Sequence, residues 1–296
     1  MSADLSVSYL GVGVCSLTAH VAAGTNYGAA DGSAQTFTVG QATPTSVAIS
    51  NLPASGTYLG GFTATVSTDG DGAPSVTSNS TSVCTVSGFV VTYVGVGTCS
   101  LTAHVAAGID YGAADGGAQT FTVAKSSQTI TFTSTVPSGA IVGGTTYTVA
   151  ATGGASGNPI TFTSRTLSVC TVSLGVVTFV KPGTCTIYAN QAGNADYAHA
   201  PRLGQTFVVS KGVQTITFTS IPPSNATVGG PTYTVMATGG ASGNAVTFTS
   251  STPRVCTISH GVVSFVRAGT CTINAREDGN ADYAAAPRVR QTFVVS

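Results

Sequence analysis

The sequence is poor in charge and contains no tryptophan. Charged residues make up 7% of the 296 residues, and ten Lys or Arg balance ten Asp or Glu, so the formal net charge at pH 7 is zero. A surface without a basic or acidic excess has no electrostatic footprint for nucleic acid or for an anionic membrane. We therefore expect neither of them as a partner.

Long apolar runs are also absent, although hydrophobic residues make up 42% of the chain. The apolar residues are mostly small and are dispersed among Thr, Ser and Gly, and no run approaches the roughly 18 to 20 residues that a helix needs to span a bilayer. No membrane span is expected in this segment. The first residues, Met1–Leu5, have neither a basic nor an apolar region, so no secretion signal is visible.

Six of the seven cysteines form pairs of constant spacing. Each pair is separated by 15 residues, and successive pairs lie 86 residues apart. The pairs are Cys84 with Cys99, Cys170 with Cys185, and Cys256 with Cys271. A period of this length indicates domains in a row. The equal spacing predicts one disulfide per repeat and hence an oxidising compartment, and the alternative is that the cysteines are buried free thiols.

The seventh cysteine, Cys15, has no partner at this spacing. It begins the segment Cys15–His20, which copies Cys99–His104 at an offset of 84 residues. Cys15 therefore corresponds to the second cysteine of a repeat, and its partner would fall just before Met1. We expect Cys15 to be unpaired and the sequence to be part of a longer protein, with any secretion signal upstream.

The repeats predict four units along the chain. A partial unit that keeps only the last three strands occupies residues 1–39, and full units follow at 40–124, 125–211 and 212–296. The last two units are near-copies of each other, and the unit at 40–124 is closest to the partial one.

Within each unit, short alternating segments rich in Val, Thr, Ile, Phe and Tyr are broken by Gly, Pro, Asn and Ser. This pattern is typical of antiparallel strands and turns, and no helical stretch is found. In the unit at 125–211 it predicts seven strands, at 128–134, 145–152, 159–164, 168–173, 176–180, 184–190 and 205–210. Seven strands in about 85 residues predict an all-β fold of tandem immunoglobulin-like sandwiches, with one disulfide per repeat.

The alternation also predicts which side chains face the core. Cys185, Ile187 and Ala189 share one face of their strand, whereas Thr186 and Tyr188 share the other. The same register turns the first cysteine of the pair inward on its own strand. Two inward cysteines on nearby strands can form a disulfide.

One segment resembles a known family. Residues 251–273 read Ser-Thr-Pro-Arg-Val-Cys-Thr-Ile-Ser-His-Gly-Val-Val-Ser-Phe-Val-Arg-Ala-Gly-Thr-Cys-Thr-Ile. The segment resembles the signature of bacterial Ig-like domains of group 2, which runs Ser-x-x-x-Val-Ala-Thr-Val, then Gly-Val-Val-Thr, then Ala-Gly-Thr-Ala-Thr-Ile. The turns at 194–197 and 280–283 resemble the Asp-x-Asn-Tyr turn of related repeats. Alanine is usual in the family where this chain has both cysteines, so the resemblance does not imply the disulfide.

The resemblance implies a secreted or surface-anchored bacterial protein, often an adhesin of the invasin and intimin type in which tandem units form a stalk. We therefore expect an extracellular structural protein that forms a stalk, spacer or filament shaft. The expected partners are neighbouring copies or upstream repeats of the parent chain, together with host or surface glycans or proteins. The alternative is a carbohydrate- or protein-binding module of a larger secreted protein.

The sequence contains no catalytic motif in a usable context, and we expect neither an enzyme nor a cofactor. The four histidines do not converge in the predicted fold. His20 and His104 occupy a strand position that is Asn190 and Arg276 in the other units. A position that accepts these three residue types is typical of a solvated strand face.

Two acidic features are weak calcium candidates, because carboxylate oxygens suit Ca²⁺. One is the turn at 68–72, with two aspartates, and the other is the recurring turn that contains Asp110, Asp196 and Asp282. Asx-turn hydrogen bonds and packing of the adjacent tyrosine against its own unit explain the recurrence as well, and we favour this interpretation. No metal site is therefore predicted.

Overall fold

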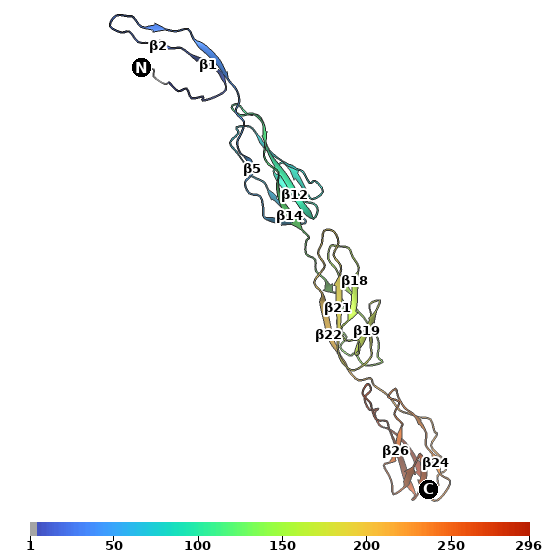
Figure 1. The fold of residues 1–296 in the computed structure, drawn as a ribbon. Helices are drawn as coiled ribbons and strands as arrows, with labels where there is room; N and C mark the ends of the chain where they lie inside the picture. The colour runs from blue at the N-terminus through green and yellow to red at the C-terminus, as the bar shows by residue number, and fades with distance from the viewer. Residues whose placement is uncertain (1–4) are drawn as a thin grey trace. The chain divides into compact units, whose positions relative to one another are not determined.

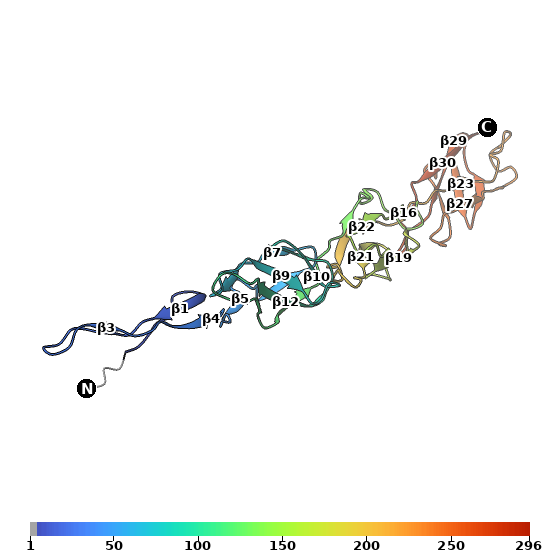
Figure 2. The same cartoon turned by 90° about the horizontal axis from the view of Figure 1, so that it is seen from above.

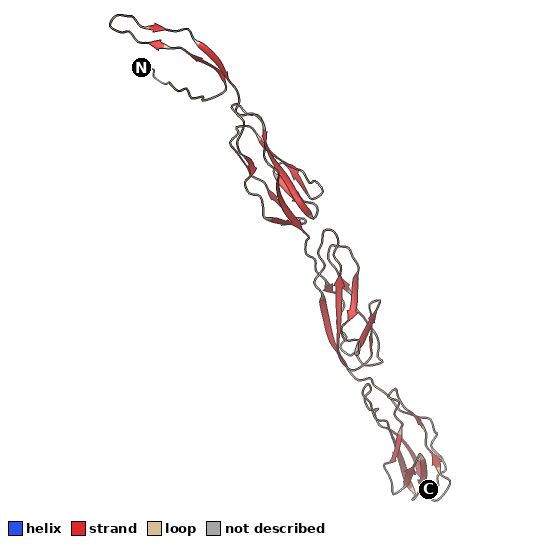
Figure 3. Cartoon of the chain, in the orientation of Figure 1, coloured by secondary structure: helices blue, strands red, loops and turns tan. Residues whose placement is uncertain are grey.

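The computed structural model describes residues 5–296, and all regular elements in this range are strands (Figure 1, Figure 3). Residues 1–4 of the predicted partial unit lie outside the described residues. The chain forms two compact units, Met1–Ser127 with Gly193–His199, and Gln128–Ala192 with Ala200–Ser296. The predicted all-β fold of immunoglobulin-like sandwiches with one disulfide per repeat is confirmed. Across residues 5–296, no helix is long and apolar enough to cross a membrane.

Residues 5–39 form a narrow two-stranded ribbon, drawn in blue in Figure 1. Its strands are β1 (Gly13–Leu17), β2 (His20–Val21), β3 (Ala30–Asp31) and β4 (Gln35–Val39). β1 pairs with β4 and β2 pairs with β3, both antiparallel. The ribbon is the second half of a repeat.

Residues 40–124 form a complete sandwich, and Figure 2 shows several of its strands within one packed body. One sheet has the order β10-β11-β7, a larger one has the order β13-β12-β14-β6 with β9 beside β12, and β5 pairs with β8. The strands are β5 (Val47–Ile49), β6 (Ser55–Thr57), β7 (Gly61–Thr63), β8 (Val66–Thr68), β9 (Pro74–Ser78), β10 (Cys84–Ser87), β11 (Val90–Tyr93), β12 (Gly97–Val105), β13 (Ala114–Asp115) and β14 (Gln119–Ala124).

Residues 125–211 and 212–296 have the same topology as each other. In the first, the sheets have the orders β16-β20-β19, β18-β21-β22 and β15-β17, and in the second β24-β28-β27, β26-β29-β30 and β23-β25. The strands of the first are β15 (Thr131–Phe132), β16 (Tyr147–Thr148), β17 (Ala151–Thr152), β18 (Ile160–Ser164), β19 (Cys170–Ser173), β20 (Val176–Phe179), β21 (Gly183–Gln191) and β22 (Leu203–Val209). The strands of the second are β23 (Thr217–Phe218), β24 (Tyr233–Thr234), β25 (Ala237–Thr238), β26 (Thr247–Ser250), β27 (Cys256–Ser259), β28 (Val262–Phe265), β29 (Gly269–Arg276) and β30 (Val289–Val295).

Two predicted strands differ from the structure. The predicted strand at 128–134 is only two residues long, and the predicted strand at 145–152 is divided into β16 and β17, which belong to different sheets. At the division, Val149 N–H donates to the Gly175 carbonyl (2.8 Å). Ser134 Oγ bonds both the N–H and the carbonyl of Ala150, at 3.0 and 3.2 Å. These bonds satisfy the backbone where the chain crosses between sheets, and sequence alternation does not record them.

The predicted inward face of β21 is the core of the sandwich. Cys185, Ile187 and Ala189 are fully buried, whereas Thr186 and Tyr188 are half-buried. Three aromatic rings close one end of this core, with the Phe207 ring in edge-on contact with Tyr147 and Phe179. The alternation of buried apolar and partly exposed side chains therefore positions the disulfide inside the sandwich.

Candidate functional site: disulfide staples and docking turns

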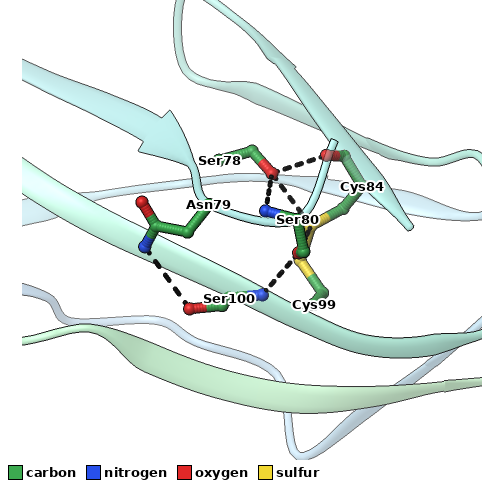
Figure 4. Close-up of a disulfide and its surroundings, with 6 residues drawn as sticks. All are labelled: Ser78, Asn79, Ser80, Cys84, Cys99 and Ser100. Atoms are coloured by element: carbon green, nitrogen blue, oxygen red, sulfur yellow. Dashed lines mark hydrogen bonds between the residues drawn. A yellow bond between two sulfur atoms is a disulfide. The ribbon is translucent and has the colours of Figure 1, made fainter. Parts of the chain in front are cut away.

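The disulfide between Cys84 and Cys99 is surrounded by serine hydroxyls (Figure 4). Ser78 Oγ donates to the Cys84 carbonyl (2.6 Å) and lies 3.5 Å from Cys84 Sγ. Ser80 Oγ accepts the Ser100 N–H (2.8 Å) and lies 3.4 Å from the same sulfur. Both cysteines are fully buried. The hydroxyls satisfy backbone groups beside the disulfide, and the bond is shielded from solvent reductants.

The other two disulfides have the same surroundings. They join cysteines that are also 15 residues apart. The hydroxyls that lie 3.4 to 3.6 Å from the first sulfur are Ser164 and Thr166 beside Cys170, and Ser250 and Thr252 beside Cys256. Cys15 is half-buried and carries no disulfide in the described structure. The cysteine that lacks a repeat partner in sequence thus also lacks one in space.

Asparagine side chains hold the Asn-Ala-Asp-Tyr turns. Asn194 Oδ1 accepts the N–H groups of Asp196 (2.9 Å) and Tyr197 (2.8 Å). Asn280 Oδ1 forms the same two bonds in its own turn, both 2.8 Å long. These are Asx-turn bonds, and they account for asparagine at this position without a bound ion.

The corresponding turn at 108–111 has Gly108 in place of this asparagine, and Asp71 from another loop replaces it. Asp71 Oδ2 accepts the N–H groups of Ile109 (2.8 Å) and Asp110 (2.9 Å), and Oδ1 accepts that of Tyr111 (3.2 Å). The Asp110 N–H, together with those of Ile109 and Tyr111, lowers the pKa of Asp71 below its ordinary value. The Asp71 carboxylate therefore accepts hydrogen bonds from the turn amides, as the neutral side chains of Asn194 and Asn280 do in the later units.

Low pH is expected to destabilise the turn at 108–111 but not the corresponding turn at 194–197. Because the pKa of Asp71 is lower in the folded state, its stabilising contribution is full above the ordinary Asp pKa of about 3.9 and is lost as pH falls through the folded value. Hydrogen exchange at 109–111, corrected for its intrinsic pH dependence, should accelerate below about pH 4. Exchange at 196–197, where Asn194 holds the turn, should not change. Equal acceleration in both turns would refute this account.

The turns at 194–197 and 280–283 each end in a tyrosine that contacts the preceding predicted unit. Tyr197 packs edge-on against Tyr58, with ring centroids 5.5 Å apart and an interplanar angle of 85°. Ser126 connects the two, because its Oγ donates to the Tyr58 carbonyl (2.5 Å) and its N–H donates to the Asp196 carbonyl (2.9 Å). Lys125 Nζ also donates to a carbonyl of this turn (2.5 Å). The turn is thus held against residues of both predicted units.

Tyr283 occupies the corresponding place later in the chain, and it packs against the hydrophobic core of residues 140–209. Two glycines make room for its ring. A Cβ atom at Gly212 would lie 2.7 Å from the ring, and one at Gly143 would lie 3.3 Å from the hydroxyl. Gly143 also has a φ of 69°, a conformation that favours glycine. Lys211 Nζ donates to the Asn280 carbonyl (2.6 Å), as Lys125 does in the earlier turn.

The calcium candidates are separated from one another. Among residues 5–296, no group of three or more His, Cys, Asp or Glu side chains is positioned to hold a metal ion. Asp110 Oδ1 accepts the Val12 N–H (3.1 Å). Asp196 and Asp282 contribute main-chain carbonyls, which accept the N–H groups of residues 126 and 212 at 2.9 Å. The recurrence of aspartate therefore coincides with a recurring backbone contact.

The acidic turn at 68–72 serves the backbone as well. The Thr45 hydroxyl donates to Asp69 Oδ2 (2.5 Å), and the N–H groups of Thr45 and Ser46 donate to the same carboxylate, each at 3.0 Å. The Thr45 hydroxyl and these N–H groups lower the pKa of Asp69 below its ordinary value. Asp69 thus fixes the entry to β5.

His20 and His104 lie on the strand face predicted for them, and each of these two has an aspartate partner. His20 Nδ1 lies 2.6 Å from Asp31 Oδ1, and His104 Nδ1 lies 2.7 Å from Asp115 Oδ1. All four side chains are substantially exposed. Sequence reasoning missed the aspartates, because each lies 11 residues further along the chain and is brought into position by the pairing of short strands.

Sequence reasoning also missed a buried polar position. Gln191 and Glu277 occupy the same place in their units and are 3% and 0% exposed. The Gly154 N–H donates to Gln191 Oε1 (2.8 Å), and the Gly240 N–H donates to Glu277 Oε2 (2.7 Å). Ser242 Oγ donates to the other oxygen of Glu277 (2.8 Å). These side chains fasten a Gly-Gly loop to the core.

Two open cavities occupy equivalent places in the later units, with volumes of about 640 and 430 Å³. The first is lined by apolar side chains and threonines, including Val149, Phe162 and Leu174. The second has a similar lining with His260 at its rim.

The chain matches no protein-family model, and no curated protein matches it in sequence. Solved structures that resemble it have low similarity. They include the S-layer protein rSbsC(31–844) (16% identity, TM-score 0.28, covering 94% of this chain and 44% of that one), mouse Cadherin-23 EC22-24 (16%, 0.30, 83% and 92%) and Sidekick-1 immunoglobulin domains 1-5 (14%, 0.32, 94% and 65%). The chain thus spans less than half the length of the S-layer chain.

Proposed function

We propose that this chain is a structural repeat segment of an extracellular protein, and that it serves as a stalk, spacer or filament shaft. The bacterial adhesin-like parent indicated by the sequence resemblance is part of this proposal. The observation that carries it is the recurring contact of Tyr197 and Tyr283 with the preceding predicted unit. A chain of independent binding modules has no need of such contacts, whereas a load-bearing array does.

The disulfides support both the location and the mechanical role. Three buried disulfides are typical of proteins in an oxidising compartment, and they are expected outside the cytosol. Each one locks the 15-residue segment that connects its two strands. A pulled repeat would then unfold only outside this segment as long as the disulfide remains oxidised.

The alternative of a carbohydrate- or protein-binding module depends on aromatic rings exposed at the ends of the units. Tyr58 and Tyr197 instead contact each other, and Tyr283 packs against a core. These three rings are therefore engaged within the chain and do not form an exposed platform for a ligand. We propose no enzymatic activity, because most of the polar side chains described above are hydrogen-bonded to backbone groups and form no convergent site.

Single-molecule force spectroscopy of the whole chain tests the mechanical role. We expect three unfolding events with equal gains in contour length. After reduction each gain should increase by about 50 Å, since a released 15-residue segment extends by 3.3 to 3.6 Å per residue. The Cys170→Ala and Cys185→Ala double variant is the matched control. Before reduction, only the unfolding of residues 125–211 should then show the larger gain in contour length. Unfolding without discrete, resistant events would exclude a load-bearing role.

A further inference from the structure

The ribbon of residues 5–39 retains the second half of a repeat. Residues 9–39 differ from residues 93–123 only at positions 10, 14, 25, 26 and 33. The strand register is also the same, because Cys15 faces Phe37 across β1 and β4 just as the corresponding residues face each other across β12 and β14. The Tyr9 and Phe37 rings keep their edge-on contact, at 5.7 Å. The half-repeat thus has the pairing that it has in a complete repeat.

Its inward face is uncovered in the described structure. Leu17 is 42% exposed where Leu101 is 0%, and Val21 is 66% exposed where Val105 is 0%. Figure 1 shows no second layer against β1 and β2. We call this surface the acceptor face, and it comprises Tyr9, Cys15, Leu17, Ala19, Val21 and Phe37. A contiguous apolar face of this kind marks an interaction surface.

The repeat at 40–124 shows what covers such a face. In its core, Leu101 is packed with Ile49, Val76 and Cys84, which come from β5, β9 and β10. Cys84 also forms the disulfide to Cys99. β9 pairs with β12 in the same sheet, whereas β5 and β10 belong to other sheets. All three strands lie within residues 40–88, which we call the first-half segment.

A second copy of this chain cannot cover the acceptor face without loss. Each copy has one first-half segment at 40–88 but two nearly identical second halves, at 9–39 and 93–123. A copy that donated its own segment would uncover Leu101 and Cys99, which are fully buried. This exchange between two copies buries no additional apolar surface, so the hydrophobic effect does not favour it.

We propose that the acceptor face binds a first-half repeat segment that is not part of residues 1–296. The occupant has the strand pattern of β5 to β10 and a cysteine at the place of Cys84. It completes the sandwich, and its cysteine bonds to Cys15. The pairing of β10 with β11 sets the register, with the occupant's cysteine opposite Tyr9 as Cys84 is opposite Tyr93. This inference does not depend on the mechanical role proposed above.

The covalent step is a thiol–disulfide exchange with oxidised glutathione as the oxidant. The Cys15 thiolate attacks one glutathione sulfur, and the glutathione S–S bond breaks to give a mixed disulfide and one glutathione thiolate. The occupant's thiolate then attacks the Cys15 sulfur and releases the second glutathione. Two cysteines are oxidised, one glutathione disulfide is reduced to two thiols, and the two protons pass to these thiols.

The test mixes the full chain with a synthetic polypeptide of residues 40–88 in a glutathione redox buffer. We expect a one-to-one complex by native mass spectrometry, with peptide mapping that shows Cys15 joined to Cys84 of the polypeptide. Hydrogen exchange in β1 and β4 should slow at least tenfold. A complex that leaves the Cys15 thiol free, or no complex at all, would overturn the proposal.

Two substitutions separate the acceptor face from the rest of the ribbon. Leu17→Asp places a charge on the face and should weaken binding at least a hundredfold. Val14→Asp, on the opposite face and 73% exposed, is the matched control and should bind as the unmodified chain does. A polypeptide with Cys84→Ser should still bind, but without the covalent bond. Protection of β1 and β4 in a dimer of the chain alone would make a second copy the occupant and refute the proposal.

A chain in which residues 40–88 are also placed directly before residue 5 avoids any difficulty with solubility of the polypeptide. We expect it to contain four disulfides and no titratable thiol after unfolding without reductant. The unmodified chain should show one thiol, from Cys15. A persistent free thiol in the extended chain would overturn the proposal independently of the binding experiment.

Discussion

Replacing Cys170 and Cys185 together by alanine is expected to lower the free energy of unfolding of residues 125–211 by about 3 kcal/mol. The disulfide closes a 15-residue loop, and removing this constraint increases the conformational entropy of the unfolded chain. Small domains have total stabilities of roughly 5 to 15 kcal/mol, so the loss is a large share. Hydrogen exchange of the slowest amides in β21 should accelerate about a hundredfold.

Strand β19, which contains Cys170, supplies the control for this prediction. Thr171 and Ser173 are exposed on the outward face of β19, and their replacement by alanine should change stability by less than about 0.5 kcal/mol. The amides of β29, whose own disulfide remains intact, serve as an internal reference. Acceleration of less than tenfold in β21 would show that core packing alone, and not the disulfide, sets the stability of this unit.

The sequence predicted the parts of the fold that depend on alternation. The strand through Cys185, Ile187 and Ala189 was predicted at 184–190 and runs from Gly183 to Gln191, because these three inward side chains are apolar. The division of the predicted strand at 145–152 could not be predicted in this way. It depends on the hydroxyl of Ser134, which is distant in sequence and bonds the backbone of Ala150. A period of two along one strand contains no information about such a bond.

The turns at 108–111, 194–197 and 280–283 were predicted only in part. The recurrence of asparagine, aspartate and tyrosine located the turns. The role of Asp71 was missed, because nothing local links it to the amides of residues 109–111. Tyr283 was expected to pack against its own unit, whereas it packs against the core of residues 140–209. Sequence patterns identify an aromatic residue that will be buried, but the surface that buries it depends on how two units meet.

Replacing Tyr283 by alanine is therefore expected to destabilise the contact with residues 140–209 by about 2 kcal/mol. The ring is half-buried, so the loss should be smaller than the 3 to 5 kcal/mol typical of a fully buried aromatic residue. Backbone bonds that depend on this contact join Gly212 N–H to the Asp282 carbonyl and Ala284 N–H to the Gly212 carbonyl, both at 2.9 Å. Hydrogen exchange at these two amides should accelerate roughly thirtyfold.

Two controls show whether the ring itself is responsible. Tyr283→Phe keeps the aromatic surface against the core, and exchange at residues 212 and 284 should stay close to that of the unmodified chain. Tyr197→Ala removes the corresponding ring from the earlier turn, where it contacts Tyr58, and should leave both amides unchanged. If Tyr283→Ala also leaves them unchanged, the glycine-lined space around the ring contributes nothing to holding the turn. The contact could then not transmit load between the two predicted units, and the stalk proposal would lose the observation that carries it.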